Sequence, residues 1–396
     1  MPRVLSLSTL FPNAHTPRFG TFVARQMEAL AARPDWDVTV INPIGVPPIA
    51  AGRYAPLAKA ACDGLENGVQ VYRPRFTLFP KIGGRFNPAM IARKVLPLAW
   101  KLHAERPFDV LDAQFFYPDG PAVARIAREL GLPFSIKARG ADISHWGEID
   151  YSRSAMVEAA KSAAGVLAVS ERLRLDMGDI GLPVEKITVH YTGLDRSLFR
   201  PLDRDQCRAH LAEQFEVALG PEEKLVTSVG ALIPRKGQAL LIAMIADMPD
   251  THLALVGRGE DREMLAAEAR QLGVGKRVHF LGGLDHTELP VVLSASDVMA
   301  LNSASEGLAN AWVEALACGT PVVTTDVGGA RELVQSDTAG RLVPYDPDFD
   351  PEPFAKATRE VLAANYAQAE VAANAARFSW DANAAALAEY YSGLID

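Results

Sequence analysis

The sequence predicts an α/β protein built from two Rossmann-like domains, each with a parallel β-sheet. Short apolar runs alternate with longer segments of helical periodicity along most of the 396 residues, as expected of repeated βαβ units. That length fits two domains. Hydrophobic residues make up 49% of the chain and charged residues 22%, so each domain can bury a core of its own.

The first half contains most of the strands that we predict. Helix 21–32 places Phe22, Val23, Met27 and Leu30 near one face, as expected of a helix packed on a sheet. Helices are also predicted at 119–130 and 153–162, and strands at 3–9, 37–41, 69–73, 109–113, 133–138, 165–169 and 187–190.

The second half begins after Phe199-Arg200-Pro201, with a polar, charged stretch at 201–223 that is predicted as a linker with a short helix. Its predicted strands are 224–229, 251–256, 277–281, 297–301, 321–325 and 341–344, and its helices 237–247, 261–272, 286–295, 310–318 and 329–335. The predicted domains are therefore 1–200 and 201–377. A helix in the tail, 378–396, with Ser379 as its N-cap, either closes the second core or returns to the first domain, and the residues alone leave both open.

The overall composition narrows the class of protein. A net charge of −8 argues for solubility and against a nucleic-acid binder. Cys62, Cys207 and Cys318 lie far apart, which indicates neither a disulfide framework nor a zinc site. The apolar run Val4–Leu10 is too short for a signal peptide, and no stretch of about 20 apolar residues predicts a membrane span. We therefore expect a cytoplasmic protein.

The most informative segment lies between Leu301 and Gly319. A strand ends near Leu301, a polar loop follows, and Asn310 is the predicted N-cap of the next helix, with Gly319 at its C′ position. Such a loop offers backbone N–H groups and a helix dipole to an anion, which suits a diphosphate. Gly307 allows the backbone to approach a ligand closely.

Two carboxylates flank this predicted anion site. Glu306 lies in the loop and Glu314 in the first turn of the helix. Because acids repel phosphates, their better role is to accept hydrogen bonds from sugar hydroxyls. Singly, each residue is more simply a solvated acid; together with Gly307 and the helix start, they favour a binding site.

The segment EGLANAWVEALACGTPVVTTDVGGARELV, starting at Glu306, resembles the signature of the group 1 glycosyltransferases, family 4 of the retaining GT-B enzymes. The resemblance implies two Rossmann-like domains facing each other across a cleft. The N-terminal domain would bind the acceptor and the C-terminal domain a nucleotide-sugar. It also implies that Glu306 contacts donor-sugar hydroxyls and Glu314 the ribose. Backbone groups at the helix start would contact the sugar diphosphate: Gly307, Leu308, Ala309 and Asn310.

A second element of the predicted donor site follows the first strand of the second half. Gly230 ends that strand, and Lys236 lies at a predicted helix start, where a cation is unfavourable unless an anion binds there too. The simpler alternative is that Arg235 and Lys236 are solvated. The segment resembles the family element whose Lys contacts the diphosphate. Many relatives carry Arg directly after the Gly; Ala231 stands there in this chain, so we expect Arg235 to substitute.

The segment Gly257-Arg258-Gly259 follows another predicted strand. The dinucleotide-binding fingerprint Gly-x-Gly-x-x-Gly would need a third glycine where Arg262 stands. The absence of that glycine weakens a dinucleotide-binding interpretation. The segment instead resembles a family element near the nucleotide, which makes Gly257 a donor-site candidate.

Acceptor-side candidates come from the first half. The loop before helix 21–32 makes Gly20 and Thr21 candidates, although an ordinary surface loop fits equally well. The segment Lys137–Asp142 resembles the family's strand-end motif HGxD, with Arg139 in place of the common His. Arg139 is no general base, since its pKa is too high, but it suits phosphate or an acidic acceptor. Asp142 either orients the sugar or caps a helix.

We expect no metal and no cofactor. The DxD-like triplets Asp35-Trp-Asp37 and Asp346-Pro-Asp348 are better explained as surface turns than as a Mg²⁺ site. Lys236, Arg235 and helix N-termini would instead neutralise the leaving phosphates.

Residues 69–106 carry a net charge of +7 with interleaved apolar residues. Such a mixture suits an anionic membrane surface. A helix pair with an apolar core face and solvated charges explains it equally well.

Together these patterns predict a retaining, metal-independent glycosyltransferase acting on a saccharide or lipid-linked acceptor. The family resemblance implies the retaining mechanism, in which the acceptor attacks the same face of the donor sugar from which the diphosphate departs. Glu306, Lys236, Arg235 and Asp142 are the predicted catalytic group. The alternatives are a nucleotide-sugar epimerase or phosphorylase, a noncatalytic sugar-nucleotide-binding subunit and an NAD-dependent oxidoreductase.

Overall fold

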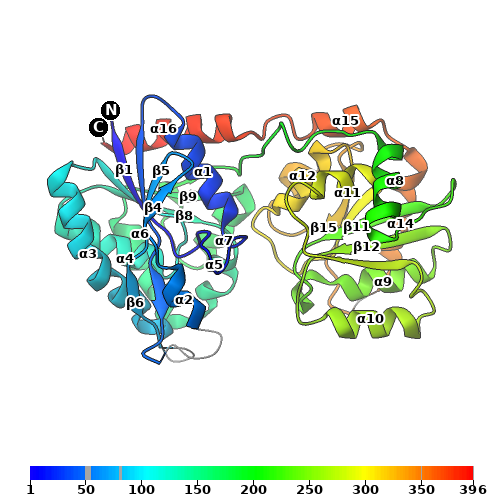
Figure 1. Cartoon of the computed structure of the whole chain (residues 1–396), viewed down its shortest axis with the longest axis horizontal. Coiled ribbons are helices and arrows are strands. Elements are labelled where there is room, and N and C mark those ends of the chain that lie inside the picture. The colour runs from blue at the N-terminus through cyan, green and yellow to red at the C-terminus, as the bar shows by residue number, and fades with distance from the viewer. Residues whose placement is uncertain (50–54, 80–82, 349, 396) are drawn as a thin grey trace. The chain divides into compact units, whose positions relative to one another are not determined.

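The computed structural model describes residues 1–49, 55–79, 83–348 and 350–395. The chain forms two compact units. Unit 1 comprises Met1–Gly193 together with Trp380–Asp396, and unit 2 comprises Leu194–Ser379. Both units alternate strands and helices along the chain (Figure 1). The α/β class predicted from the alternating pattern is confirmed.

Unit 1 is built on an eight-stranded sheet in the order β10-β9-β8-β7-β1-β2-β5-β4. Among the described residues, all its pairs are parallel except β4 with β5. The strands are β1 (Arg3–Leu7), β2 (Asp37–Ile41), β4 (Gly64–Glu66), β5 (Val69–Tyr72), β7 (Val110–Ala113), β8 (Phe134–Ala138), β9 (Gly165–Ala168) and β10 (Ile187–Val189). A separate parallel pair joins β3 (Ile44–Val46) to β6 (Arg75–Thr77).

The helices of unit 1 follow the strands in the βαβ manner predicted. They are α1 (Thr21–Ala31), α2 (Ala55–Ala60), α3 (Asn87–Glu105), α4 (Asp119–Leu130), α5 (Ala141–Ser144), α6 (Asp150–Ser162) and α7 (Glu171–Asp179). Segment 69–106 therefore contains two strands and one long helix; the helix pair considered from sequence is wrong. Its apolar residues Val69, Val71 and Phe76 are buried in strands.

The C-terminal helix α16 (Trp380–Ile395) packs against α1 in unit 1 (Figure 1). Leu387 and Tyr391 share a core with Val23 and Met27 of α1. The Asn383 side chain donates to the Tyr191 carbonyl at 2.6 Å. The tail thus completes the core of the unit that begins the chain.

Unit 2 is built on a six-stranded parallel sheet in the order β13-β12-β11-β14-β15-β16. Its strands are β11 (Lys224–Val229), β12 (Thr251–Val256), β13 (Val278–Gly282), β14 (Val298–Leu301), β15 (Val322–Thr325) and β16 (Gly340–Val343). The strands are almost continuous apolar runs because helices cover the sheet. These helices are α8 (Arg204–Phe215), α9 (Gln238–Ala246), α10 (Arg262–Gln271), α11 (Leu289–Ala295), α12 (Asn310–Ala317), α13 (Ala330–Leu333), α14 (Glu352–Ala364) and α15 (Gln368–Ala373).

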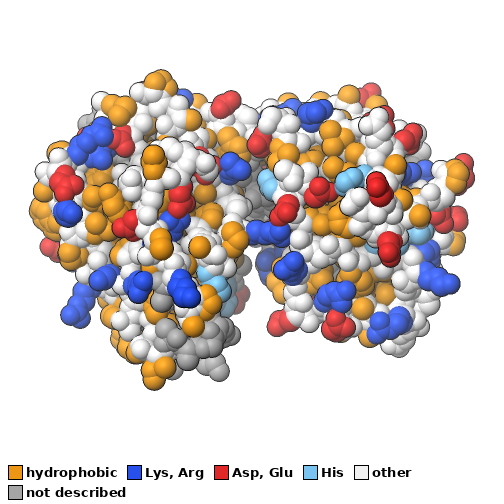
Figure 2. All heavy atoms as spheres, in the orientation of Figure 1, with side chains coloured by type: hydrophobic (Ala, Val, Ile, Leu, Met, Phe, Trp, Pro, Cys, Tyr) orange, Lys and Arg blue, Asp and Glu red, His pale blue; other side chains and the backbone are white. Residues whose placement is uncertain are grey.

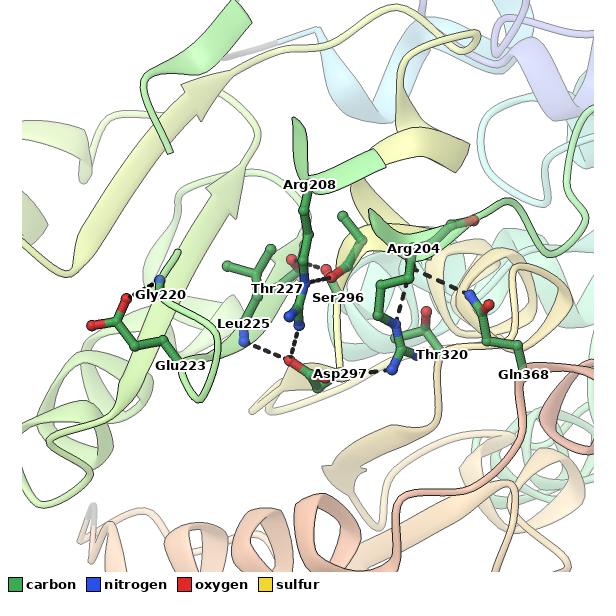
Figure 3. Close-up of polar contacts among 12 residues, drawn as sticks. Arg204, Arg208, Gly220, Glu223, Leu225, Thr227, Ser296, Asp297, Thr320 and Gln368 are labelled. Carbon is green, nitrogen blue, oxygen red and sulfur yellow. Dashed lines mark hydrogen bonds and ion pairs between the residues drawn. The ribbon is translucent and has the colours of Figure 1, made fainter. Parts of the chain in front are cut away.

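Asp297, at the amino end of β14, ties the first helix of unit 2 to the sheet (Figure 3). Its carboxylate accepts from Arg208 at 2.6 Å and from the Leu225 backbone N–H at 2.7 Å. The carboxylate is only 11% exposed, so these charge-assisted bonds hold better than surface pairs. The segment predicted as a linker is therefore anchored to the sheet through α8.

Candidate functional site

The loops after β11, β12, β14 and β15 meet at the carboxyl edge of the unit 2 sheet. A Cβ on Gly257 (φ 150°) would lie 1.8 Å from the Gly230 carbonyl oxygen, and one on Gly237 (φ 62°) 2.2 Å from that of Asn302. No other residue fits at either position. The Gly329 N–H donates to the Gly307 carbonyl at 2.7 Å. In parallel α/β sheets, this edge is where ligands bind.

Glu306 and Lys236 form an ion pair at this edge. Lys236 Nζ contacts Glu306 Oε1, and the two side chains are only 12% and 10% exposed. Arg235 Nη1 lies 3.8 Å from the same oxygen and also donates to the Ser305 carbonyl. The structure thus brings Glu306 together with the adjacent pair Arg235 and Lys236, which lies about 70 positions earlier in the sequence.

The argument that placed Lys236 at a helix start is wrong. Lys236 ends a 3₁₀ turn (Pro234–Lys236), Gly237 follows in the left-handed conformation, and α9 begins at Gln238. The glycine separates the lysine from the helix. The anion beside Lys236 is the Glu306 carboxylate.

The start of α12 also differs from the prediction. Ala309 is the N-cap, without a side-chain hydrogen bond, and Asn310 is the first helical residue. The predicted Asn310 cap is wrong because the extended turn occurs one residue earlier. Gly307, Leu308 and Ala309 are buried immediately before the helix.

Glu314 lies in the second turn of α12, not in the first as predicted. Its side chain is partly exposed, and desolvation raises the pKa of its carboxyl group to about 7. Among the described residues, this carboxyl group makes no hydrogen bond or ion pair. A desolvated carboxyl group that has no partner is suited to accept hydroxyl hydrogen bonds.

In unit 1, the predicted residues also lie at carboxyl ends of strands. Gly20 (φ 73°) precedes α1 without a side-chain cap, and Thr21 is the exposed first residue of that helix. Asp142 is fully buried. Its carboxylate accepts from the backbone N–H groups of Phe116, Arg139 and Gly140, at 2.9, 2.9 and 2.8 Å. These contacts favour a residue that shapes the loops over one that touches the sugar.

Arg139 follows β8 and is held by two glutamines. Its Nε donates to the Gln114 carbonyl at 3.2 Å. Its Nη2 contacts the side-chain oxygens of Gln26, at 3.3 Å, and of Gln114. Its guanidinium carbon lies 5.2 Å from the centre of the Phe22 ring. Burial lowers the pKa of Arg139 to about 10, so its charge persists at neutral pH.

Sequence reasoning did not single out the buried groups behind Arg139. Lys137 Nζ lies 2.9 Å from Gln26 Oε1 and 2.5 Å from His190 Nδ1. Burial lowers the pKa of both Lys137 and His190 well below their usual values. The available signal was a lysine within the apolar strand Phe134–Ala138.

Hollows of the described residues that lie apart from the predicted site residues include one at α10, lined in part by Met264 and Glu268. A groove of about 680 Å³ lies between α4 and α6, lined in part by Arg125, Pro133 and Ala159. None of the predicted site residues lines it. In the described part of the chain, no three His, Cys, Asp or Glu residues cluster as metal ligands do. No helix there is long and apolar enough to cross a membrane.

Two protein families match the chain. The family described as "Glycosyl transferase 4-like domain" matches residues 19–193, and "Glycosyl transferases group 1" matches residues 211–378. The two matches together span most of the chain. The second contains Lys236, Glu306 and Glu314.

Curated relatives include a D-inositol 3-phosphate glycosyltransferase of Mycobacterium marinum. It is 35% identical over 52% of this chain and 45% of its own length. The chain thus spans about half the length of the first curated relatives that it matches. A putative teichuronic acid biosynthesis glycosyltransferase, TuaC of Bacillus subtilis, is 27% identical over 84% of this chain and 82% of its own.

Solved structures share the fold over the full length. Anabaena Alr3699/HepE in complex with UDP has a TM-score of 0.74 and 22% identity, covering 99% of this chain and 100% of its own. A sucrose-phosphate synthase from Thermosynechococcus elongatus has a TM-score of 0.78 and 21% identity, covering 100% and 99%. These matches confirm the GT-B fold class that the sequence predicted.

Proposed function

Because this chain belongs to the group 1 glycosyltransferases, we propose that it transfers a sugar from a nucleotide-diphosphate-sugar to a saccharide or lipid-linked acceptor. The observation that carries the proposal is the meeting of Glu306, Lys236 and Arg235 at the carboxyl edge of the unit 2 sheet. A carboxylate for sugar hydroxyls thus lies beside two cations suited to a diphosphate.

Each donor-side residue has a proposed role. Lys236 and Arg235 stabilise the charge that develops on the leaving diphosphate. Glu306 accepts hydrogen bonds from the donor sugar, and Glu314 from the ribose. The backbone of Gly307, Leu308, Ala309 and Asn310 faces the sugar diphosphate, while Gly230 and Gly257 let the neighbouring loops approach it.

The proposed stereochemistry is retention, without a metal. The described loops of unit 2 offer the Glu306 carboxylate, which is already paired with Lys236, so we assign no covalent sugar intermediate to it. The leaving phosphate takes the acceptor proton as the new bond forms on the same face. NMR assignment of the product anomer tests this step, and an inverted product contradicts it.

The donor is identified by screening nucleotide-sugars with the full chain. A ligand at 100 times its Kd adds about 2.7 kcal/mol to stability, which thermal shift detects. Turnover of that donor is then measured with an acceptor panel. Transfer to an acceptor supports the proposal, whereas a changed sugar without an acceptor supports an epimerase or phosphorylase. Binding without turnover supports a noncatalytic subunit, and binding of NAD instead of nucleotide-sugars supports an oxidoreductase.

The acceptor is proposed to bind unit 1, near Gly20, Thr21 and Arg139. The matched relatives are described as acting on inositol phosphate and in teichuronic acid biosynthesis. Both descriptions concern acceptors or polymers that carry negative charge. Polysaccharide or glycoconjugate synthesis is accordingly the proposed setting.

A second part of the proposal is reversible contact with an anionic membrane surface from the cytoplasm, where we place the protein. Within segment 69–106, Phe86 and Trp100 are 59% and 48% exposed, and Arg93 and Lys94 are exposed on α3. Figure 2 shows basic and hydrophobic side chains interspersed on the visible face of unit 1. Each basic residue near such a surface contributes about 1 kcal/mol.

Of the basic residues in this segment, one is buried and one lies outside the described residues. Arg73 is buried and pairs with Glu66 at 2.5 Å; Lys81 and Ile82 lie outside the described residues. Sedimentation with anionic and neutral vesicles tests the proposal. Binding to anionic vesicles should fall with salt and in an Arg93→Glu/Lys94→Glu variant, with Arg128→Glu on α4 as control. Equal binding to both vesicle types contradicts it.

A further inference from the structure

Arg139 has an unusual environment for a largely buried cation. Both of its side-chain partners are amides, Gln26 and Gln114, and a carbonyl completes the set. Amide oxygens satisfy hydrogen bonds but leave the positive charge in place. Among the described residues, no carboxylate lies within ion-pair distance of the guanidinium.

One nitrogen of the Arg139 guanidinium has no hydrogen-bond partner among the described residues. Nη1 makes no hydrogen bond within the described part of the chain, and it is not among the buried polar atoms that lack a partner. Nη1 therefore keeps some solvent-accessible surface, while Nε and Nη2 bind the glutamines. Nη1 is thus the guanidinium nitrogen that remains able to donate a charge-assisted hydrogen bond to a carboxylate or phosphate oxygen.

The amides are themselves fixed in orientation. Lys137 Nζ binds Gln26 Oε1, Gln26 Nε2 donates to Gln114 Oε1 at 3.0 Å, and Gln114 Nε2 donates to Asp112. Each amide nitrogen is thus engaged, so both amide oxygens remain turned toward Arg139. The side chain is held in one place before any ligand arrives, which lowers the entropy cost of binding.

Three acids of unit 1 are fully buried and already bonded, and two of them, Asp112 and Asp142, interact electrostatically with Arg139. Asp142 binds three backbone N–H groups, Asp119 accepts from Thr9 N–H at 2.8 Å, and Asp112 accepts from Ser6 at 3.0 Å. Burial raises the pKa of all three, to about 7 for Asp119. None of these carboxyl groups forms an ion pair with the Arg139 guanidinium, so Nη1 has no acidic partner among the described residues.

We propose that Arg139, held by Gln26 and Gln114, is a specificity-determining residue that selects a saccharide carrying a carboxylate or phosphate. The inference rests on the proposed function, because it names the class of substrate for that reaction. It also accounts for the arginine at a position where the family commonly has histidine: the side chain does not take up a proton but binds an anion.

The test compares matched probes on the full chain by ligand-observed NMR titration. Methyl glucuronide carries a carboxylate, glucose 6-phosphate a phosphate, and methyl glucoside neither. We expect at least one charged probe to bind about tenfold more tightly than the glucoside, as a hydrogen-bonded charge contributes. The two charged arms distinguish carboxylate from phosphate.

Variants assign the preference to this side chain. Arg139→Gln and Arg139→His should remove it, and Arg139→Lys should keep part of it because the charge remains without the fork. Arg128→Gln, at the exposed end of α4, should keep it whole. Unchanged melting temperatures exclude misfolding.

Two outcomes overturn the inference. One is equal or absent binding of the charged probes in the wild-type chain, and the other is a preference that survives Arg139→Gln. Donor turnover is measured on the same preparation. Turnover without the preference defeats only this inference, whereas the preference without turnover defeats only the proposed function.

Discussion

The two units place charge at the same edge of the same kind of sheet, but they treat it differently. In unit 2, Lys236 and Glu306 neutralise each other across the loops after β11 and β14. In unit 1, Arg139 is held after β8 by amides that leave its charge unpaired. A paired charge must be released when a ligand binds, whereas an unpaired charge is ready for an anion. Whether the charge at a strand end is neutralised or unpaired therefore depends on its hydrogen-bond partners and not on the topology of the sheet.

The largest effect is expected where the pair in unit 2 is broken. Glu306→Gln should lower donor turnover by about 10²–10³-fold, the loss typical of removing one transition-state contact. It should nevertheless bind the nucleoside diphosphate more tightly, because Lys236 no longer has a competing carboxylate. Steady-state kinetics and calorimetry measure the two, with the exposed Glu263→Gln as control. Weaker diphosphate binding in Glu306→Gln would show that the pair does not restrain Lys236.

The difference between the two units can be removed by introducing an ion pair beside Arg139 in unit 1. Gln26→Glu places a carboxylate beside Arg139 Nη2 and Lys137 Nζ. We expect the anion preference to fall by about tenfold, since the new carboxylate neutralises the site. The probe titrations measure this, with Gln26→Met separating charge from lost support. If Gln26→Glu keeps the full preference, Arg139 is not its source.

Glu314 supplies a smaller effect, which depends on pH. The pKa of the Glu314 carboxyl group is raised to about 7 in the folded chain. The folded chain therefore keeps this proton at pH values where the unfolded chain has already released it. The stability associated with that proton is therefore present in acid and lost as pH rises through 7. Glu314→Gln should raise the Tm by about 2–4 °C at pH 8, not at pH 5, while weakening nucleotide-sugar binding. An equal shift at both pH values would mean that Glu314 is not desolvated.

The smallest effect is expected from chelation. If Lys236 and Arg235 supply the positive charge at the donor site, EDTA should leave the turnover rate unchanged. Turnover is measured before and after dialysis against EDTA and after adding Mg²⁺ or Mn²⁺. If activity disappears and either ion restores it, a metal ion and not the two side chains supplies the positive charge at the donor site.

The sequence by itself determined the fold class and the order of the strands in the second half, whereas β3, β4 and β6 of the first half were not predicted. Segments 224–229 and 251–256 became β11 and β12 with the predicted bounds, because parallel strands covered by helices on both faces are mostly apolar. Gly319 also ends α12 with φ 82° as predicted. The family signature identified Glu306 and Glu314, since their spacing is local.

Only the tertiary structure decided how these residues are paired. The contact of Lys236 with Glu306, and that of Gln26 and Gln114 with Arg139, join loops far apart in the chain. No local pattern encodes such partners, because they depend on which strands lie side by side in the sheet. The same reason explains the wrong predictions. Asn310 as a cap and Lys236 at a helix start depended on turns whose backbone is set by the neighbouring loops.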